Sequence, residues 1–351
     1  MQTVCLGQVL RFRARATGLD RRRRLHPGAW RDAAYGGLQD SAPRSALIAL
    51  HARLDGVRPA SWEEPSLWQI WFRSADYVVP REDFGVFTIG ALPRQQEQAA
   101  ALDATALAVC DTLAGQSLDA RKLGSLLPEA LCRRGLMPLP RPVLLVRTAN
   151  VTGRYRIRWD ASRVTVIPTD RPEIDPDQAR IELARRFLGW HGPATSDQFA
   201  RWAGVSREDA TLTWKVLAPQ LISVAMDGQV RHLLAQDEES LRRTEPITGV
   251  RLLPAGDPYV AVDRALADAT AAGVPPPVGD ERGASLTPRL VNSLAGRILM
   301  DGTIVGSWGR YQHHVAIHLW QAHRRQRERV LDEAESLAGP IGKPIQVRWL
   351  H

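Results

Sequence analysis

The sequence predicts an α+β fold in which helical segments are followed, three times along the chain, by a two-stranded β-hairpin. Three turn signals carry this prediction: Asp160-Ala-Ser162, Asp227-Gly228 and Asp301-Gly302 each lie between short stretches of alternating apolar and polar residues. Asp-Gly favours the tight turns that join antiparallel strands. Apolar residues at helical spacing precede the hairpins. No clear sequence repeat accompanies them, so the expected repetition is one of architecture.

Residues 177–245 show the clearest order of elements. Helices are expected over 179–190, 196–204 and 206–219, and strands on both sides of Asp227-Gly228. Ser196 and Ser206 are the expected N-caps of the second and third helices. Three helices followed by a hairpin are the elements of a winged helix, a module that usually places a helix in a DNA groove.

The flanking regions complete a prediction of three domains, at 1–168, 177–245 and 246–351, with a linker rich in Pro and Asp over 168–176. In the first domain, an aromatic-rich block from Trp62 to Phe72 is expected in the core. Helices are expected there over 4–16, 45–54, 82–89, 95–113 and 118–127, a strand over 77–79 and a hairpin over 155–166. The last domain is expected to contain a helix over 261–272, a hairpin over 298–305, a strand over 315–320 and a charged helix over 321–337.

Composition restricts the class of protein. The 351 residues include 46 Lys and Arg against 38 Asp and Glu, for a net charge of +8. Arginine supplies most of this excess, which suits phosphate contacts, although a GC-rich genome also favours arginine codons. The chain starts with no long apolar stretch, so a reduced, soluble, cytoplasmic protein without a membrane span is expected.

Metal and cofactor sites are not expected. Three cysteines lie far apart with no CxxC pair, which predicts neither a disulfide framework nor a zinc site. His314 and His318 share a strand face, and His313 adjoins them, but no Cys or Asp cluster accompanies them, so no bound metal is predicted.

Several stretches, in this order, resemble the winged-helix DNA glycosylases of the AlkZ/YcaQ family. They are 37–47 with 51–54, 77–80, 190–195, 252–259 and 298–308. The resemblance implies three tandem winged helices that form a concave DNA-binding cleft. It also implies an enzyme that excises N7-alkylpurines and unhooks interstrand crosslinks by hydrolysing the N-glycosidic bond.

The same resemblance implies catalytic residues. The family carries a Gln-x-Gln or Gln-x-Asp motif, and the matching positions here are Gln39, Asp40 and Ser41. If this segment is extended, Gln39 and Ser41 share one side and Asp40 points away. If it enters a helix, no two of them align, and Asp40 can replace the missing partner. A purely structural interpretation is that Gln39 and Asp40 cap the helix entering at Pro43.

Such residues suit the chemistry. An N7-alkylated purine is already cationic and leaves without a strong general acid, while the sugar gains oxocarbenium character. A carboxamide orients water by accepting and donating hydrogen bonds, and a carboxylate offsets the developing charge.

Seven arginines are candidates for DNA contact: Arg21, Arg22, Arg23, Arg24, Arg44, Arg53 and Arg310. The run from Arg21 to Arg24 is equally consistent with a solvated face. Arg44 and Arg53 flank the glutamine motif and can instead form structural ion pairs with Asp40 or Glu63.

The expected partner is double-stranded DNA, alkylated or crosslinked, bound by a monomer. The alternative is a winged-helix protein that binds or regulates DNA without chemistry. A third interpretation is binding of a small alkylating metabolite or a protein.

Overall fold

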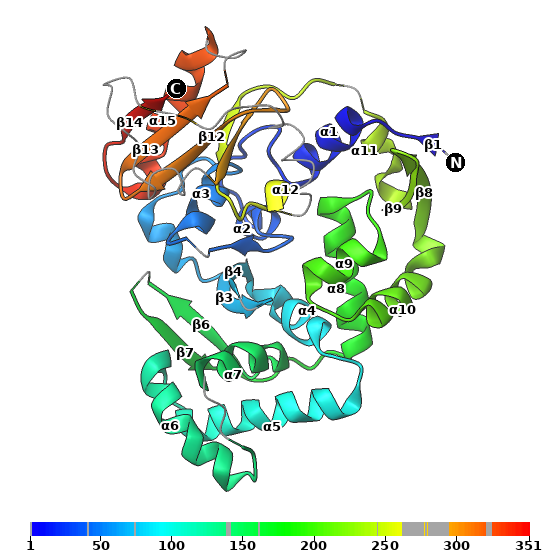
Figure 1. Cartoon of the computed structure of the whole chain (residues 1–351), viewed down its shortest axis with the longest axis vertical. Helices are drawn as coiled ribbons and strands as arrows, with labels where there is room; N and C mark the ends of the chain where they lie inside the picture. Colours follow the sequence, from blue (N-terminus) through cyan, green and yellow to red (C-terminus); the bar gives the residue numbers. More distant parts are fainter. Residues whose placement is uncertain are drawn as a thin grey trace. The chain divides into compact units, whose positions relative to one another are not determined.

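The computed structural model describes residues 2–40, 42–73, 75–137, 142–160, 162–243, 245–261, 277, 279, 295–320 and 325–351. Its elements form two compact units, each built from segments that are discontinuous in sequence. The first unit contains Met1–Val4, Ala34–Pro43 and Pro65–Glu238, and the second contains Cys5–Ala33, Arg44–Glu64 and Glu239–His351. Helices and sheets occur in both, which confirms the mixed α+β class (Figure 1). These units cut across the three expected domains, whose division stays a prediction.

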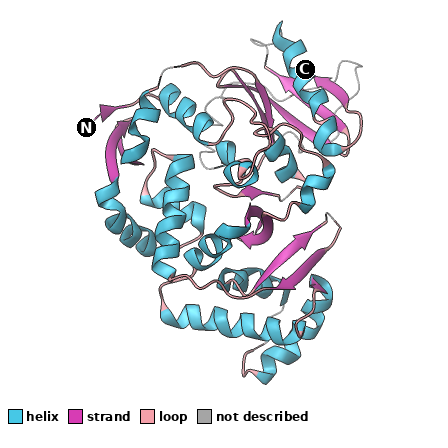
Figure 2. Ribbon diagram, turned by 180° about the vertical axis from the view of Figure 1, so that it is seen from behind, coloured by secondary structure: helices cyan, strands magenta, loops and turns pink. Residues whose placement is uncertain are grey.

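The first unit contains a six-stranded sheet with the order β2-β4-β3-β6-β7-β5. Its strands are β2 (Leu38–Gln39), β3 (Leu67–Phe72), β4 (Ala75–Pro80), β5 (Leu118–Asp119), β6 (Tyr155–Trp159) and β7 (Val164–Pro168). Three helices cover one face of β6 and β7 (Figures 1 and 2): α5 (Gln96–Leu113), α6 (Ala120–Arg133) and α7 (Pro142–Ala149). Trp71, Tyr155 and Ile157 belong to the core on this face.

The opposite face of β3 is aromatic. Phe72 contacts Phe87 of α4 (Phe84–Thr88) at 5.6 Å and Trp202 of α9 (Ser196–Ala203) at 5.3 Å between ring centroids. The aromatic-rich block is therefore largely core, as expected. Short 3-10 turns connect these elements: η2 (Arg81–Asp83), η3 (Ile89–Ala91) and η4 (Asn150–Thr152).

The expected three helices and hairpin are present within the first unit. They are α8 (Pro176–His191), α9, α10 (Arg207–Leu217), β8 (Leu221–Met226) and β9 (Gln229–Leu234), with η5 (Ala218–Gln220) before β8. Asp227 and Gly228 have φ of 50° and 74°, as the expected tight turn requires. The expected N-cap Ser196 is wrong by one residue: the Thr195 side chain accepts from the Gln198 N–H, completing a capping box.

One strand of this module was not expected. β1 (Gln2–Thr3) adds to β8 in parallel, so that the hairpin becomes a three-stranded sheet with the order β1-β8-β9. The first unit ends at Glu238, just after the short η6 turn (Ala235–Asp237), so helix α11 (Glu238–Arg242) lies almost wholly in the second unit.

The second unit contains a five-stranded sheet with the order β10-β11-β12-β13-β14. Its strands are β10 (Val250–Leu253), β11 (Gly296–Met300), β12 (Thr303–Tyr311), β13 (His314–Leu319) and β14 (Gln346–Leu350). Asp301-Gly302 forms the expected turn between β11 and β12. The helices are α1 (Leu6–Ala16), α2 (Ala29–Ala33), α3 (Ser45–His51), α12 (Pro258–Ala261), α15 (Arg327–Ser336) and α16 (Ala338–Ile341), with η1 (Pro59–Glu63).

Two helices expected in this unit extend into residues that the structure does not describe. The helix expected over 261–272 lies almost wholly outside the described residues. Helix α15 spans Arg327–Ser336 of the helix expected over 321–337, whose first four residues lie outside the described residues. Among the helices that are described, none is both long and apolar enough to cross a membrane.

Candidate functional site around Gln39

Gln39 lies on an edge strand of the six-stranded sheet. In the antiparallel ladder between β2 and β4, Gln39 lies opposite Tyr77, and Leu38 lies opposite Val78. The pairing continues one residue further, since the Asp40 N–H donates to the Asp76 carbonyl at 2.7 Å. The motif therefore starts in an extended conformation, which excludes the alternative in which it enters a helix.

The capping interpretation stays a prediction. Helix α3 begins at Ser45, and its N-cap residue is Arg44 in a left-handed conformation. Gln39 and Asp40 lie in the preceding strand pairing.

A chain of two hydrogen bonds holds the Gln39 carboxamide. The Tyr77 hydroxyl donates to Gln39 Oε1 at 3.4 Å, and the Arg73 guanidinium donates to the Tyr77 hydroxyl oxygen. Burial raises the pKa of Tyr77, while the charge of Arg73 opposes that shift. The phenol therefore stays protonated at neutral pH and keeps its hydrogen for Gln39.

Asp40 lies on the other face of the sheet. Successive side chains of an extended strand point to opposite faces, so the Asp40 side chain points away from that of Gln39. It is buried, with 2% of its surface exposed. The notion that Asp40 replaces the missing partner of Gln39 depends on a helical segment, and a part for Asp40 in the reaction stays a prediction. Ser41, the third residue of the motif, lies outside the described residues.

Asp76 is a second carboxyl on the same face of the sheet as Asp40, opposite Gln39. It lies opposite Trp71 in the β3–β4 ladder, on the side covered by α7. Burial raises the pKa of Asp76, and the charge of Arg147 on α7 opposes the shift. Both carboxyls therefore lie on the face of the sheet opposite Gln39.

Two glycines allow the segment that leads into β2 to pack closely against neighbouring aromatic rings. A Cβ at Gly36 would lie 2.4 Å from the Trp190 ring, and Gly37 has a φ of 78° that favours glycine. Tyr35, just before them, packs under the Arg186 guanidinium at 3.9 Å, and Arg186 binds Asp83 at 2.9 Å. The stretches 37–47 and 190–195 contribute to the family resemblance, but only the fold shows that Trp190 and Arg186 pack against the segment before β2.

Arg53 is not a DNA-contacting residue in this structure, which corrects that expectation. Its side chain is 1% exposed and forms two hydrogen bonds with the Asp257 carboxylate, at 2.7 and 3.0 Å. It also donates to the carbonyls of Thr17 and Ala49. Asp257 also accepts from the Tyr259 N–H at 3.0 Å. The pair thus ties α3 to the α12 segment within the second unit.

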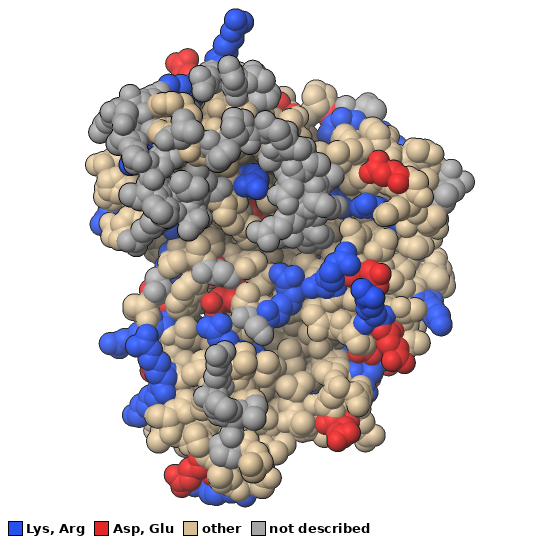
Figure 3. Space-filling model, in the orientation of Figure 1, with Lys and Arg blue, Asp and Glu red and all other residues tan. Residues whose placement is uncertain are grey.

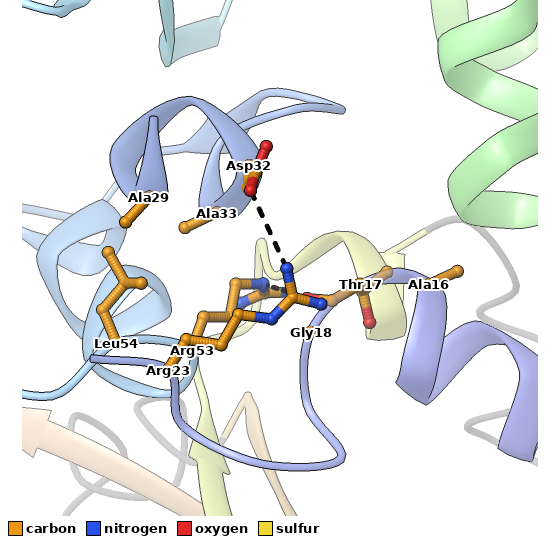
Figure 4. Close-up of a pocket in the computed structure, with 9 residues that line it drawn as sticks. All are labelled: Ala16, Thr17, Gly18, Arg23, Ala29, Asp32, Ala33, Arg53 and Leu54. Carbon is orange, nitrogen blue, oxygen red and sulfur yellow. Dashed lines mark hydrogen bonds and ion pairs between the residues drawn. The ribbon is translucent and has the colours of Figure 1, made fainter. Parts of the chain in front are cut away.

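The run from Arg21 to Arg24 is divided in its roles. Arg22 is half-buried and donates to Glu333 and to the His51 carbonyl, both at 2.6 Å, so it is a structural residue. Arg21, Arg23 and Arg24 are exposed. Figure 4 shows Arg23 reaching toward Asp32, 3.9 Å away, beside a small cavity of about 20 Å³ that Arg53 also lines.

The structure brings together Arg44 and Arg310. Both line a cavity of about 200 Å³ in the second unit, whose other walls are apolar: Leu47, Ile48, Pro59, Pro340 and Ile341. The Arg44 guanidinium stacks on Trp62, 4.0 Å from the ring centroid. The Arg310 guanidinium donates to the Gln312 carbonyl at 2.9 Å.

His314 and His318 occur on the same strand, β13, as expected. Within the described ranges, no group of three His, Cys, Asp or Glu side chains is placed to hold a metal ion.

Comparison with known proteins gives one family. A family model described as DNA glycosylase AlkZ-like matches residues 33–339. An interstrand DNA cross-link repair glycosylase of Streptomyces sahachiroi is 27% identical over 142 residues, which are 38% of this chain and 35% of that protein. The chain thus matches about a third of that relative's length.

The solved structure of the Streptomyces sahachiroi DNA glycosylase AlkZ is similar with a TM-score of 0.71. The match covers 99% of this chain and 100% of that one at 18% identity, so the two share a fold. Because the family model matches well over half of its length, the chain belongs to the DNA glycosylase AlkZ-like family.

Proposed function

We propose that this protein is a DNA glycosylase that hydrolyses the N-glycosidic bond of N7-alkylated purines, including those in interstrand crosslinks. The observation that carries the proposal is the Gln39 carboxamide, half-buried on an edge strand and bonded by the Tyr77 hydroxyl. Gln39 is also the residue that matches the first glutamine of the family motif. The relative named as a cross-link repair glycosylase supports this substrate class.

The reaction requires no strong general acid or base from the protein. Water attacks C1′ of the deoxyribose, and the bond from C1′ to purine N9 breaks with its electron pair passing to the base. That pair neutralises the cationic alkylated ring, so the base leaves as a neutral purine. The attacking water loses one proton to solvent, and an abasic site remains.

Gln39 acts in this scheme by positioning. Its carboxamide orients the water by hydrogen bonding and presents a dipole to the developing positive charge on the sugar. Tyr77 and Arg73 hold that carboxamide in one place, which reduces the reorganisation needed at the moment of reaction.

Ser41 gives weight to a second candidate function. The family's second motif residue is Gln or Asp, and a serine stands at the matching position. A serine holds water but contributes less charge stabilisation, so a non-catalytic protein that binds or regulates DNA is the alternative.

The wider architecture belongs to the same proposal. Three tandem winged helices would form a concave cleft for duplex DNA, and the α8–α10 helices with the β8–β9 hairpin are the elements of one of them. The protein would act as a cytoplasmic monomer, because a glycosylase needs no second copy to read half-sites.

Base release from a defined lesion tests this function. A duplex with one N7-methylguanine, and another with a crosslink, would be incubated with excess enzyme and the abasic sites measured. Release above the spontaneous rate supports the glycosylase. Tight binding with no added release on either duplex supports the non-catalytic alternative.

A further inference from the structure

Two arginines cluster around one tryptophan on the six-stranded sheet. The guanidinium carbons of Arg81 and Arg156 lie 5.2 and 5.0 Å from the centroid of the Trp68 ring, within cation–π range. Phe84 contacts Trp68 edge-on at 5.1 Å and fixes the indole. Trp68 therefore holds two cationic groups from separate elements, η2 and β6, close to one another.

The cluster brings together charges of the same sign. Arg158 lies two residues after Arg156 on β6, so the two side chains share a face of the strand. Burial, then the charge of Arg81 and then that of Arg158 lower the pKa of Arg156. Like charges at close range destabilise a fold, and an anion bound among them would relieve that cost.

The same face of the sheet carries Gln39. Ile157 pairs with Gln69, and the side chains of this pair point to one face of the sheet. Their neighbours Arg156 and Trp68 therefore share the opposite face. Ile70 lies on the same face as Trp68 and pairs with Tyr77. Tyr77 in turn lies opposite Gln39. The strand order separates Gln39 on β2 from Arg156 on β6 by three strand spacings, roughly 14 Å. At about 3.4 Å of helix axis per nucleotide, that is about four nucleotides along a DNA strand.

We propose that Trp68, Arg81, Arg156 and Arg158, here called the Trp68 platform, bind backbone phosphates of the DNA strand whose base is released at Gln39. The platform rests on the proposed DNA substrate and adds a contact surface that is absent from the seven arginines expected from sequence. Lys and Arg side chains gather over the β6–β7 hairpin in Figure 3. Guanidiniums held by an aromatic ring keep their N–H edges available for phosphate oxygens.

The test is the salt dependence of binding to an unmodified duplex, measured by fluorescence anisotropy. Arg81→Gln and Arg156→Gln would each weaken binding about five- to ten-fold at 0.1 M salt and reduce the salt slope by about 1. Trp68→Leu would weaken binding without a change of charge. The matched control is Arg133→Gln on α6, which removes the same charge from an exposed side chain paired with Glu129, and it would change affinity less than two-fold. Thermal unfolding shows that each variant is folded, and Arg81 is exposed, so its replacement disturbs no core.

The platform and the proposed function fail separately in this design. Platform variants that bind like Arg133→Gln, while the wild type binds with a steep salt slope, overturn the platform and leave the glycosylase proposal standing. Weakened binding confined to the platform variants supports the platform even where no base is released. A wild type that binds no duplex at low salt overturns both.

Discussion

Gln39 and Tyr77 lie opposite one another on the neighbouring strands β2 and β4, and the Tyr77 hydroxyl donates a hydrogen bond to Gln39 Oε1 at 3.4 Å. Arg73 donates in turn to that hydroxyl. The register of two short strands thus positions the side chain to which the proposed function assigns the attacking water.

Tyr77→Phe removes one hydroxyl and keeps the ring that packs on Phe72. Loss of a single hydrogen bond is worth about 1 kcal/mol, so the single-turnover rate of base release should fall about five-fold. Duplex affinity should stay within two-fold, since the phenol contacts Gln39 and Arg73 within the protein. An equal fall in affinity and rate would instead indicate that Tyr77 contacts DNA.

Asp40→Asn tests which face of the sheet performs the chemistry. Because Asp40 is buried on the face away from Gln39, neutralising its carboxylate should leave the single-turnover rate within two-fold of wild type. The measurement uses folded protein quantified by circular dichroism. A rate loss of a hundred-fold in folded protein would mean that Asp40 takes part in the reaction.

Arg53→Met separates structure from DNA contact. It leaves Asp257 as a buried carboxylate without its ion pair, so the free energy of unfolding should fall by about 3–5 kcal/mol. Duplex affinity at a temperature where the variant is folded should match the wild type. Adding Asp257→Asn should restore part of the lost stability; a variant of full stability with weakened DNA binding would refute the buried-pair role.

The burial of His51 should make the free energy of unfolding depend on pH. Burial and the charges of Arg22 and Arg251 lower the pKa of His51 to about 3, so it is neutral in the folded protein above that pH. The unfolded chain takes up a proton below about pH 6.5, so stability falls as the pH drops from 7 to 5, by about 2 kcal/mol. Denaturant unfolding at both pH values measures this loss.

The control for that experiment is His51→Gln, which keeps a polar partner for Ser336, the residue whose hydroxyl lies 2.9 Å from His51 Nε2. Burial raises the pKa of Asp237 to about 6, an effect that acts in the opposite direction over this range. Only the difference between wild type and variant therefore isolates His51. The same pH dependence in both proteins would contradict the assignment.

Much of the fold follows from local chemistry. Asp227-Gly228 and Asp301-Gly302 predict their turns because both residues of each pair must adopt positive φ, and they do so. The parallel addition of β1 to β8 has no such signal. Two residues at the start of the chain pair with a strand more than two hundred residues later, and pairing at that separation is set by packing.

The site was predictable in part. The residues around Gln39 carry part of the family resemblance. An extended conformation of the motif is one of the two alternatives that the sequence allows. The hydrogen-bond partner of Gln39 is not predictable from the sequence, because Tyr77 lies opposite Gln39 only through the register of β2 on β4. Arg53 shows the converse: its charge and its place near the motif suggested DNA contact, and only burial against Asp257 reveals a structural role.

The most direct test of the role proposed for Gln39 is base release by Gln39→Ala on a duplex with one N7-methylguanine, under single-turnover conditions with wild type alongside. The water-positioning role of Gln39 predicts release by the wild type above the spontaneous rate and a fall of at least a hundred-fold in the variant, with duplex affinity unchanged. A variant that releases the base as fast as the wild type would contradict the role given to Gln39.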